Sequence, residues 1–247
     1  MYEKKIKEKK ENCVVSGGKE KKSSWILSAV LLVLTPIVTF WIVQMITLLS
    51  VRYRMSGVKT IRQIITLLFT MKARYQLYNL LILSVIFVIM ILIFRKIKIA
   101  SIVFTLFMTI VALVNYYVVM FRGQPFMLLD IVGMGTAAEV VGEYHFKVSK
   151  LLALTLIGTL IFLIIQFRFQ TLELGHKGRK NRIARLSVLI IIAVTFWQIY
   201  PCVQRMPNVL LWAINSDYAG KGYTYTLLRE LKYFKVERPE GYSAETV

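Results

Sequence analysis

The chain has 247 residues, of which 57% are hydrophobic and 18% are charged, and its formal net charge is +19. Its mean hydropathy is positive, and a soluble domain of this length has no interior large enough to bury so much apolar surface. The positive charge does not form a basic face interleaved with aromatic residues, so we expect no nucleic-acid partner. A lysine-rich segment beside anionic lipid headgroups explains the charge more simply. The composition therefore predicts a polytopic membrane protein.

Residues 1–24 precede the first apolar segment and are rich in lysine. We predict that they form a disordered tail that stays in the cytoplasm, because basic segments resist translocation. The apolar run that follows is too long for the core of a secretory signal, and no small-x-small cleavage site comes after it. It is therefore expected to remain in the membrane as a signal anchor.

Five apolar segments approach or reach the length of about 20 residues that a helix needs to cross the hydrocarbon core. They are residues 25–49, 77–94, 99–121, 151–167 and 186–203. The expected fold class is all-α, with five transmembrane helices in residues 25–203 and short interfacial helices on the outer side. Basic residues are divided almost evenly between the two sides of this topology. We place the N-terminus in the cytoplasm because of the lysine tail and the cluster at 177–185, which puts the C-terminus outside.

Two segments on the predicted outer side carry apolar residues at helical spacing. In residues 57–74 the apolar residues Val58, Ile61, Ile65 and Leu68 recur at spacings of three and four with basic residues among or after them, which predicts an amphipathic helix. This helix either lies on the outer leaflet with its apolar side down or packs on the bundle as an ordinary loop helix. Residues 204–247 are predicted to form an extracellular juxtamembrane linker, in which Gly220, Gly222 and Pro239 bracket one short helix.

No pattern in the chain predicts catalysis or metal binding. Cys13 and Cys202 fall on opposite sides of the membrane in this topology, as do His145 and His176. No spacing of cysteines, histidines and carboxylates is typical of a metal site. There is also no glycine-rich phosphate loop after a strand and no nucleophile elbow. We therefore expect neither catalytic residues nor metal ligands here.

The strongest candidate for a site is the stretch 115–144, which places ionisable residues between two apolar runs. Such residues cost roughly 2.5–3.5 kcal/mol each at membrane depth, so a chain rarely retains them without a use. Pro125 lacks a backbone donor and is predicted to end the third helix just after Arg122. Thr136, with Glu139 three residues later, fits a capping box that begins a short helix. Residues 122–147 should therefore form a hairpin of short helices in the outer headgroup layer.

Arg122 and Asp130 allow two interpretations. In the first, Arg122 holds a lipid phosphate through charge-assisted hydrogen bonds while Asp130 orients it or binds a headgroup hydroxyl. In the second, the two side chains pair with each other and lock the hairpin to the third helix. Asn115 is expected to bond across helices, as buried membrane asparagines commonly do. Glu139 fits a helix cap better than a catalyst.

Short motifs in this stretch resemble the membrane domain of the lipoteichoic-acid synthase family. The motifs in question are Asn115-Tyr116-Tyr117, Phe121-Arg122-Gly123-Gln124-Pro125, Asp130, Thr136-Ala137-Ala138 and Tyr144, together with residues 220–223 and 236–243. The resemblance covers residues 77–247, and Asn79 also fits it. Members of this family are phosphoglycerol transferases with five N-terminal membrane helices and a large extracellular sulfatase-like domain. They transfer glycerol phosphate from phosphatidylglycerol to a growing polymer, which implies a role in cell wall biogenesis at the bacterial plasma membrane.

The resemblance does not extend to the chemistry of that family. Its threonine nucleophile and manganese ligands lie in the extracellular domain, which would begin after residue 242, whereas this chain stops at Val247. The resemblance therefore implies a truncated or separate membrane module that has no cofactor of its own, since manganese is expected only in the absent catalytic domain. The expected partners are membrane lipids, among them phosphatidylglycerol, and a separate sulfatase-like catalytic domain.

Two other functions stay open. A small transporter or flippase would need ionisable residues in the middle of several helices, and residues 25–49, 77–94 and 151–167 have almost none there. A structural scaffold would bind other cell-envelope proteins through the lysine tail or the outer helices. The favoured prediction is a membrane module that anchors a phosphoglycerol transferase and presents phosphatidylglycerol to it.

Overall fold

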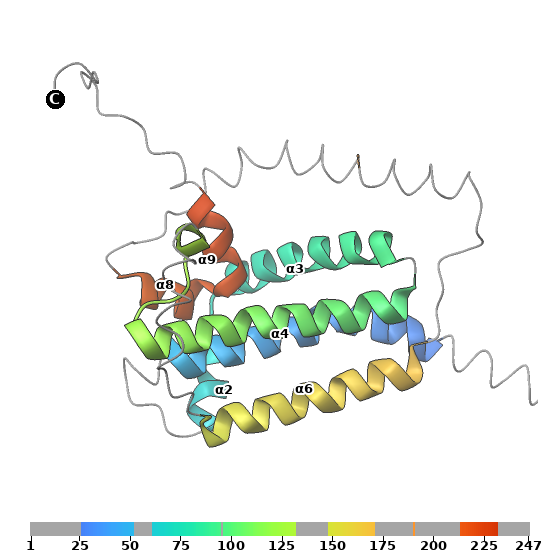
Figure 1. The fold of residues 1–247 in the computed structure, drawn as a ribbon, viewed down its shortest axis with the longest axis horizontal. Coiled ribbons are helices and arrows are strands. Elements are labelled where there is room, and N and C mark those ends of the chain that lie inside the picture. Colours follow the sequence, from blue (N-terminus) through green and yellow to red (C-terminus); the bar gives the residue numbers. More distant parts are fainter. Residues whose placement is uncertain are drawn as a thin grey trace, which may run out of the picture.

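The computed structural model describes residues 26–51, 61–94, 96–131, 148–170, 190 and 213–231, and the regular structure of these residues is helical (Figure 1). The helices in chain order are Ile26–Val51, α2 (Ile61–Thr70), α3 (Ala73–Phe94), α4 (Ile97–Arg122), the short 3-10 helix η1 (Leu128–Ile131), α6 (Lys150–Phe169), α8 (Ile214–Lys221) and α9 (Tyr223–Glu230).

Four of these helices are long and apolar enough to cross a membrane, namely Ile26–Val51, α3, α4 and α6. They match the first four predicted segments within a few residues at each end. This confirms the all-α prediction for the described residues, and the four apolar helices indicate a multi-pass membrane protein. The predicted fifth segment, 186–203, lies outside the described residues except for Ile190, and the tail 1–24 lies outside them altogether. Five crossings and the orientation of the termini therefore stay predictions.

The outer surface of the bundle explains why these sequences suit a membrane. On α6 the large apolar side chains Ile157, Leu160 and Ile164 are each more than half exposed. A helix that is apolar on all sides is stable only in a protein core or in lipid. Exposed leucines and isoleucines are compatible with lipid tails, which are equally apolar.

Helix α4 is the centre of the bundle and packs against both α3 and α6. Its inward face includes small side chains among larger ones, with Ala100, Ser101 and Ala112 fully buried. Small residues let membrane helices approach closely, and packing replaces the hydrophobic effect as the force that holds them together. The rings of Phe87 on α3 and Phe104 on α4 fill the space between these two helices, with their centroids 5.0 Å apart.

A buried polar cluster links the first helix, α4 and α6. The amide nitrogen Nε2 of Gln166 lies 3.2 Å from Oγ1 of Thr35 and 3.1 Å from Oγ1 of Thr105. The hydroxyl of Thr39 lies 3.3 Å from that of Thr105. Hydrogen bonds of this kind hold membrane helices in one register because the alternative is an unpaired polar group in hydrocarbon.

We expect Gln166→Ala to lower the free energy of unfolding in detergent by about 1 kcal/mol, a value within the range measured for hydrogen bonds between membrane helices. Thermal unfolding followed by circular dichroism measures this loss. Thr155→Ala is the matched control, because the Thr155 hydroxyl donates within α6, to the carbonyl of Leu151 at 2.9 Å. An equal loss in both variants would contradict a role for Gln166 between helices.

Helix α2 lies within the segment 57–74 that the sequence predicts to be helical. Leu68 is buried, and the ring of Phe69 lies 5.5 Å from that of Trp41 on the first helix although Phe69 is 71% exposed. Ile65 is also exposed. Helix α2 thus contacts the bundle and still presents apolar side chains outward, so its placement on the outer leaflet stays a prediction.

Helices α8 and α9 lie at the end of the bundle where α3 begins and α4 ends, and α2 lies at the same end (Figure 1). We call this the cap end, and α8 and α9 the cap helices. The sequence predicts one short helix and a linker here. The structure instead has two helices whose side chains are largely buried, among them Tyr218, Tyr223 and Tyr225.

Candidate functional site

The chain reverses direction after α4 in a turn that Arg122 holds together. Gly123 ends the helix with φ at 84°, a left-handed conformation that favours glycine, and its N–H donates to the carbonyl of Val119 at 2.8 Å. The Arg122 guanidinium donates to the carbonyls of Gln124, at 3.4 Å, and Pro125, at 2.6 Å. A single side chain thereby satisfies two successive backbone carbonyls of the loop.

The same guanidinium binds Asp130 with both terminal nitrogens. Nη1 lies 2.8 Å from Oδ1, and Nη2 contacts Oδ2. Oδ2 also accepts the backbone N–H of Met127 at 2.7 Å. The two side chains are about a third and a quarter exposed. This bidentate arrangement is the geometrically specific form of an arginine–carboxylate pair, and it supports the second interpretation above, in which Arg122 and Asp130 lock the hairpin. A lipid phosphate would have to displace these contacts.

Asn115 supports the reversal from inside α4. It is fully buried, and its Oδ1 accepts the backbone N–H of Phe126 at 2.9 Å. The expected bond to another membrane helix is therefore replaced by a bond to the loop that follows its own helix, because the turn brings a free backbone donor within reach. The rest of the predicted hairpin, with Thr136 and Glu139, lies outside the described residues, so the capping box stays a prediction.

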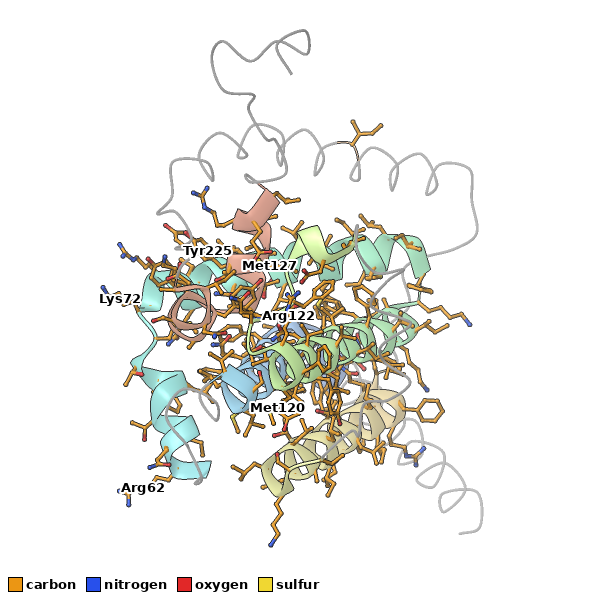
Figure 2. The ribbon with its side chains drawn as sticks, turned by 60° about the vertical axis from the view of Figure 1, so that its left-hand side comes forward. Arg62, Lys72, Met120, Arg122, Met127 and Tyr225 are labelled. Carbon is orange, nitrogen blue, oxygen red and sulfur yellow. The ribbon has the colours of Figure 1, made fainter. Side chains whose placement is uncertain are left out.

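The cap helix α8 binds the reversal directly. Nδ2 of Asn215 donates to the carbonyl of Gly123 at 2.8 Å. The Tyr218 hydroxyl lies 2.7 Å from Oε1 of Glu230 and 3.1 Å from the carbonyl of Phe126. Figure 2 shows Arg122 at the end of α4, with Met127 and Tyr225 on the same side of the molecule. Tyr218 thus connects α9, through Glu230, to the loop that Arg122 and Asn115 fix.

Two amide side chains from the membrane helices bind the junction between α8 and α9. Nδ2 of Asn79, on α3, donates to the carbonyl of Lys221 at 2.8 Å, and its Oδ1 accepts the N–H of Tyr225 at 2.9 Å. Oε1 of Gln44, on the first helix, accepts the N–H of Tyr223 at 3.3 Å. Gly222 lies between them with φ at 90°. The amides therefore satisfy backbone groups at a helix junction that cannot satisfy itself.

Sequence reasoning found only part of this cluster. Asn79 was identified only because it fits the family resemblance, and Gln44 was not identified. Both could have been found as amides inside an otherwise apolar membrane segment, since such a group needs a hydrogen-bond partner. The partners of both amides are backbone groups far along the chain, and no side-chain pattern identifies those.

The cap end is chemically suited to positioning rather than to proton transfer. Burial raises the pKa of Tyr218 well above its ordinary value, and the nearby Glu230 carboxylate adds to the effect. Burial also raises the pKa of Tyr223, and it raises the pKa of Tyr225 to about 12. These phenols are protonated donors at neutral pH. The described residues contain no group of three histidines, cysteines or carboxylates that could hold a metal ion.

Comparison of the chain with protein-family models, with curated proteins and with solved structures finds no match. The resemblance drawn from short motifs therefore stays a prediction.

Proposed function

We propose that this chain is the membrane module of a phosphoglycerol transferase of the lipoteichoic-acid synthase type. In this function the bundle anchors a sulfatase-like catalytic unit at the membrane surface, and the cap end presents phosphatidylglycerol to it. The orientation that we propose places the cap end outside the bacterial plasma membrane. Manganese would belong to the catalytic unit.

One observation supports this function above others: those motifs of the family resemblance that lie in the described residues meet in space. Asn79 binds the segment 220–223 through the carbonyl of Lys221. Asn115 and Arg122 both bind the loop after α4. Tyr218, which precedes that segment in α8, lies against the carbonyl of Phe126 in the same loop. Motifs separated by more than a hundred positions along the chain thus form one hydrogen-bonded unit.

This unit holds α9 in place beside the bundle, because α9 is tied to α3 by Asn79 and to the reversal by Tyr218. In the proposed function, α9 is the point from which the catalytic unit is held. A transferase that acts on a lipid headgroup needs its reacting groups at a defined height above the bilayer, because misplacement of about 1 Å can cost two orders of magnitude in rate. A rigid cap end meets that requirement.

The described spans do not favour transport. Their ionisable residues lie at the ends: Arg74 on α3, Lys98 and Arg122 on α4, and Lys150 and Arg168 on α6. Proton relays and ion paths normally require ionisable groups facing the interior of the bundle at membrane depth. We therefore favour the function of a membrane module over that of a transporter.

Reconstitution tests the proposed function. The chain is placed in phosphatidylglycerol liposomes, a soluble sulfatase-like phosphoglycerol transferase domain is added, and release of diacylglycerol is measured. We expect the chain to raise the transfer rate and Asn79→Ala to abolish most of the gain, because the cap helices lose two hydrogen bonds. Ser84→Ala on the same helix should retain the gain. A rate that is identical with and without the wild-type chain would refute the proposal.

A further inference from the structure

A pocket of about 360 Å³ lies at the cap end, away from the turn that Arg122 holds. Its wall comes from the end of α2, the first turn of α3 and one side of α8. The lining residues are Thr70, Met71, Lys72, Tyr75, Ser216, Asp217, Ala219, Gly220 and Lys221. Its volume is within the range of pockets that bind small molecules.

The pocket combines a free cation with neutral polar groups. Lys72 is exposed, and its ammonium group has no partner within the described part of the chain. Lys221 is paired with Asp217 at 2.8 Å, and both side chains are largely buried. Because that pair is neutral overall, Lys72 gives the pocket a net positive charge, and Ser216 adds a hydroxyl that can donate. A lysine acts on phosphate as a point charge and tolerates several orientations of the ligand.

A second cation strengthens this field. The guanidinium of Arg74 lies 4.8 Å from the centroid of the Tyr75 ring, and its Nη2 donates to the Tyr75 hydroxyl at 3.2 Å. Tyr75 lines the pocket, so Arg74 contacts a residue of the pocket wall. Lys72 and Arg74 together make this corner favourable for a group with one or two negative charges.

The position of the pocket indicates where such a group comes from. Lys72 immediately precedes α3, which is long and apolar enough to cross a membrane. The residue just before such a span is expected at the height of the lipid headgroups. Figure 2 places Lys72 at the edge of the molecule, where α2 passes into α3. On α2, next to this corner, Phe69 and Ile65 present exposed apolar side chains that can lie beside acyl chains. A phosphate reaches the pocket most directly as part of a lipid.

From this geometry we infer that the pocket at the α2–α3 corner binds the phosphate group of an anionic phospholipid, with Lys72 as its main contact. The site is separate from the Arg122 turn. It rests on the proposed function in that it names where the cap end would hold the lipid phosphate. Its test measures binding alone, so a failure here is distinguishable from a failure of the reconstitution with the transferase domain.

The test uses the full-length protein in detergent and measures binding of three probes: dihexanoyl phosphatidylglycerol, dihexanoyl phosphatidylcholine and inorganic phosphate. We expect the anionic lipid to bind and the zwitterionic lipid to bind at least several-fold more weakly. Lys72→Glu should weaken binding of the anionic lipid about tenfold or more, the loss expected for one charge-assisted contact. Inorganic phosphate should bind more weakly than the anionic lipid. Equal binding of inorganic phosphate and lipid, with the same loss in Lys72→Glu, would overturn the assignment to a lipid.

Two further variants make the test specific. Arg62→Glu reverses a charge on exposed α2 outside the pocket and should leave binding nearly unchanged. Gly220→Leu adds a side chain where a Cβ meets open space and should reduce binding by filling the pocket without changing its charge. A loss in Arg62→Glu as large as that in Lys72→Glu would show general surface attraction, and the inference would then be wrong.

Discussion

Gly222→Ala is expected to undock the cap helices. The backbone of Gly222 has φ at 90°, and a Cβ at this position would lie 2.4 Å from Nδ2 of Asn79. With ψ at 155° this is a conformation that essentially only glycine adopts, and it costs an alanine roughly 1–3 kcal/mol. Asn79 must also move, and it then loses bonds to Lys221 and Tyr225, each worth about 1 kcal/mol. The docked state should therefore lose about 3 kcal/mol or more.

Amide hydrogen exchange measures this loss at the right place. The N–H of Tyr225 is bound to Asn79 in the docked state, and its protection factor should fall roughly a hundredfold, which corresponds to the expected change in the docking free energy. Gly220→Ala is the matched control two residues away, because a Cβ there meets nothing within 4 Å. That variant should be neutral or slightly more stable, since alanine is the better helix former.

A double variant separates the clash from the backbone strain. Removing the Asn79 side chain relieves the steric conflict, so Asn79→Ala with Gly222→Ala should cost clearly less than the sum of the single variants. Additive costs would show that the two substitutions act independently, which contradicts the expected clash between Asn79 and an alanine Cβ at position 222.

The membrane class and the four described spans could be predicted from the sequence because they depend on local composition. A helix satisfies its own backbone hydrogen bonds in lipid. A sufficiently long run of apolar residues is therefore enough to predict a span. The bounds of α3 and α4 could be predicted within a few residues. The pairing of Arg122 with Asp130 was one of the two interpretations of these residues, because Pro125 forces the chain to turn between them.

The docking of α8 and α9 could not be predicted in the same way. Tyr218, Asn79 and Gln44 bind mainly to backbone groups, such as the carbonyl of Phe126 and the N–H of Tyr223. The position of a backbone group depends on the path of the whole chain and not on the identity of its residue. Residues 213–231 therefore looked like a linker with one amphipathic helix, although the structure buries them.

Arg122→Ala is expected to release the loop after α4 and to lower the free energy of unfolding by about 2 kcal/mol. The variant removes the bonds to the carbonyls of Gln124 and Pro125 and both contacts with Asp130. Hydrogen bonds to charged groups contribute roughly 1.5–3 kcal/mol each when buried, and we take a low total because the pair is partly exposed and screened by solvent. Thermal unfolding in detergent measures the loss.

Three further variants decide whether Arg122 acts through this geometry or only through its charge. Arg122→Lys keeps the charge but lacks the planar fork that contacts Asp130 twice, so it should recover less than half of the lost stability. Asp130→Ala combined with Arg122→Ala should cost less than the sum of the two, since each variant already breaks the same pair. Arg168→Ala, at the other end of the bundle on α6, should change stability little. Full recovery in Arg122→Lys would mean that a positive charge alone suffices at this position, and the lipid-phosphate interpretation of Arg122 would then regain support over the locked turn.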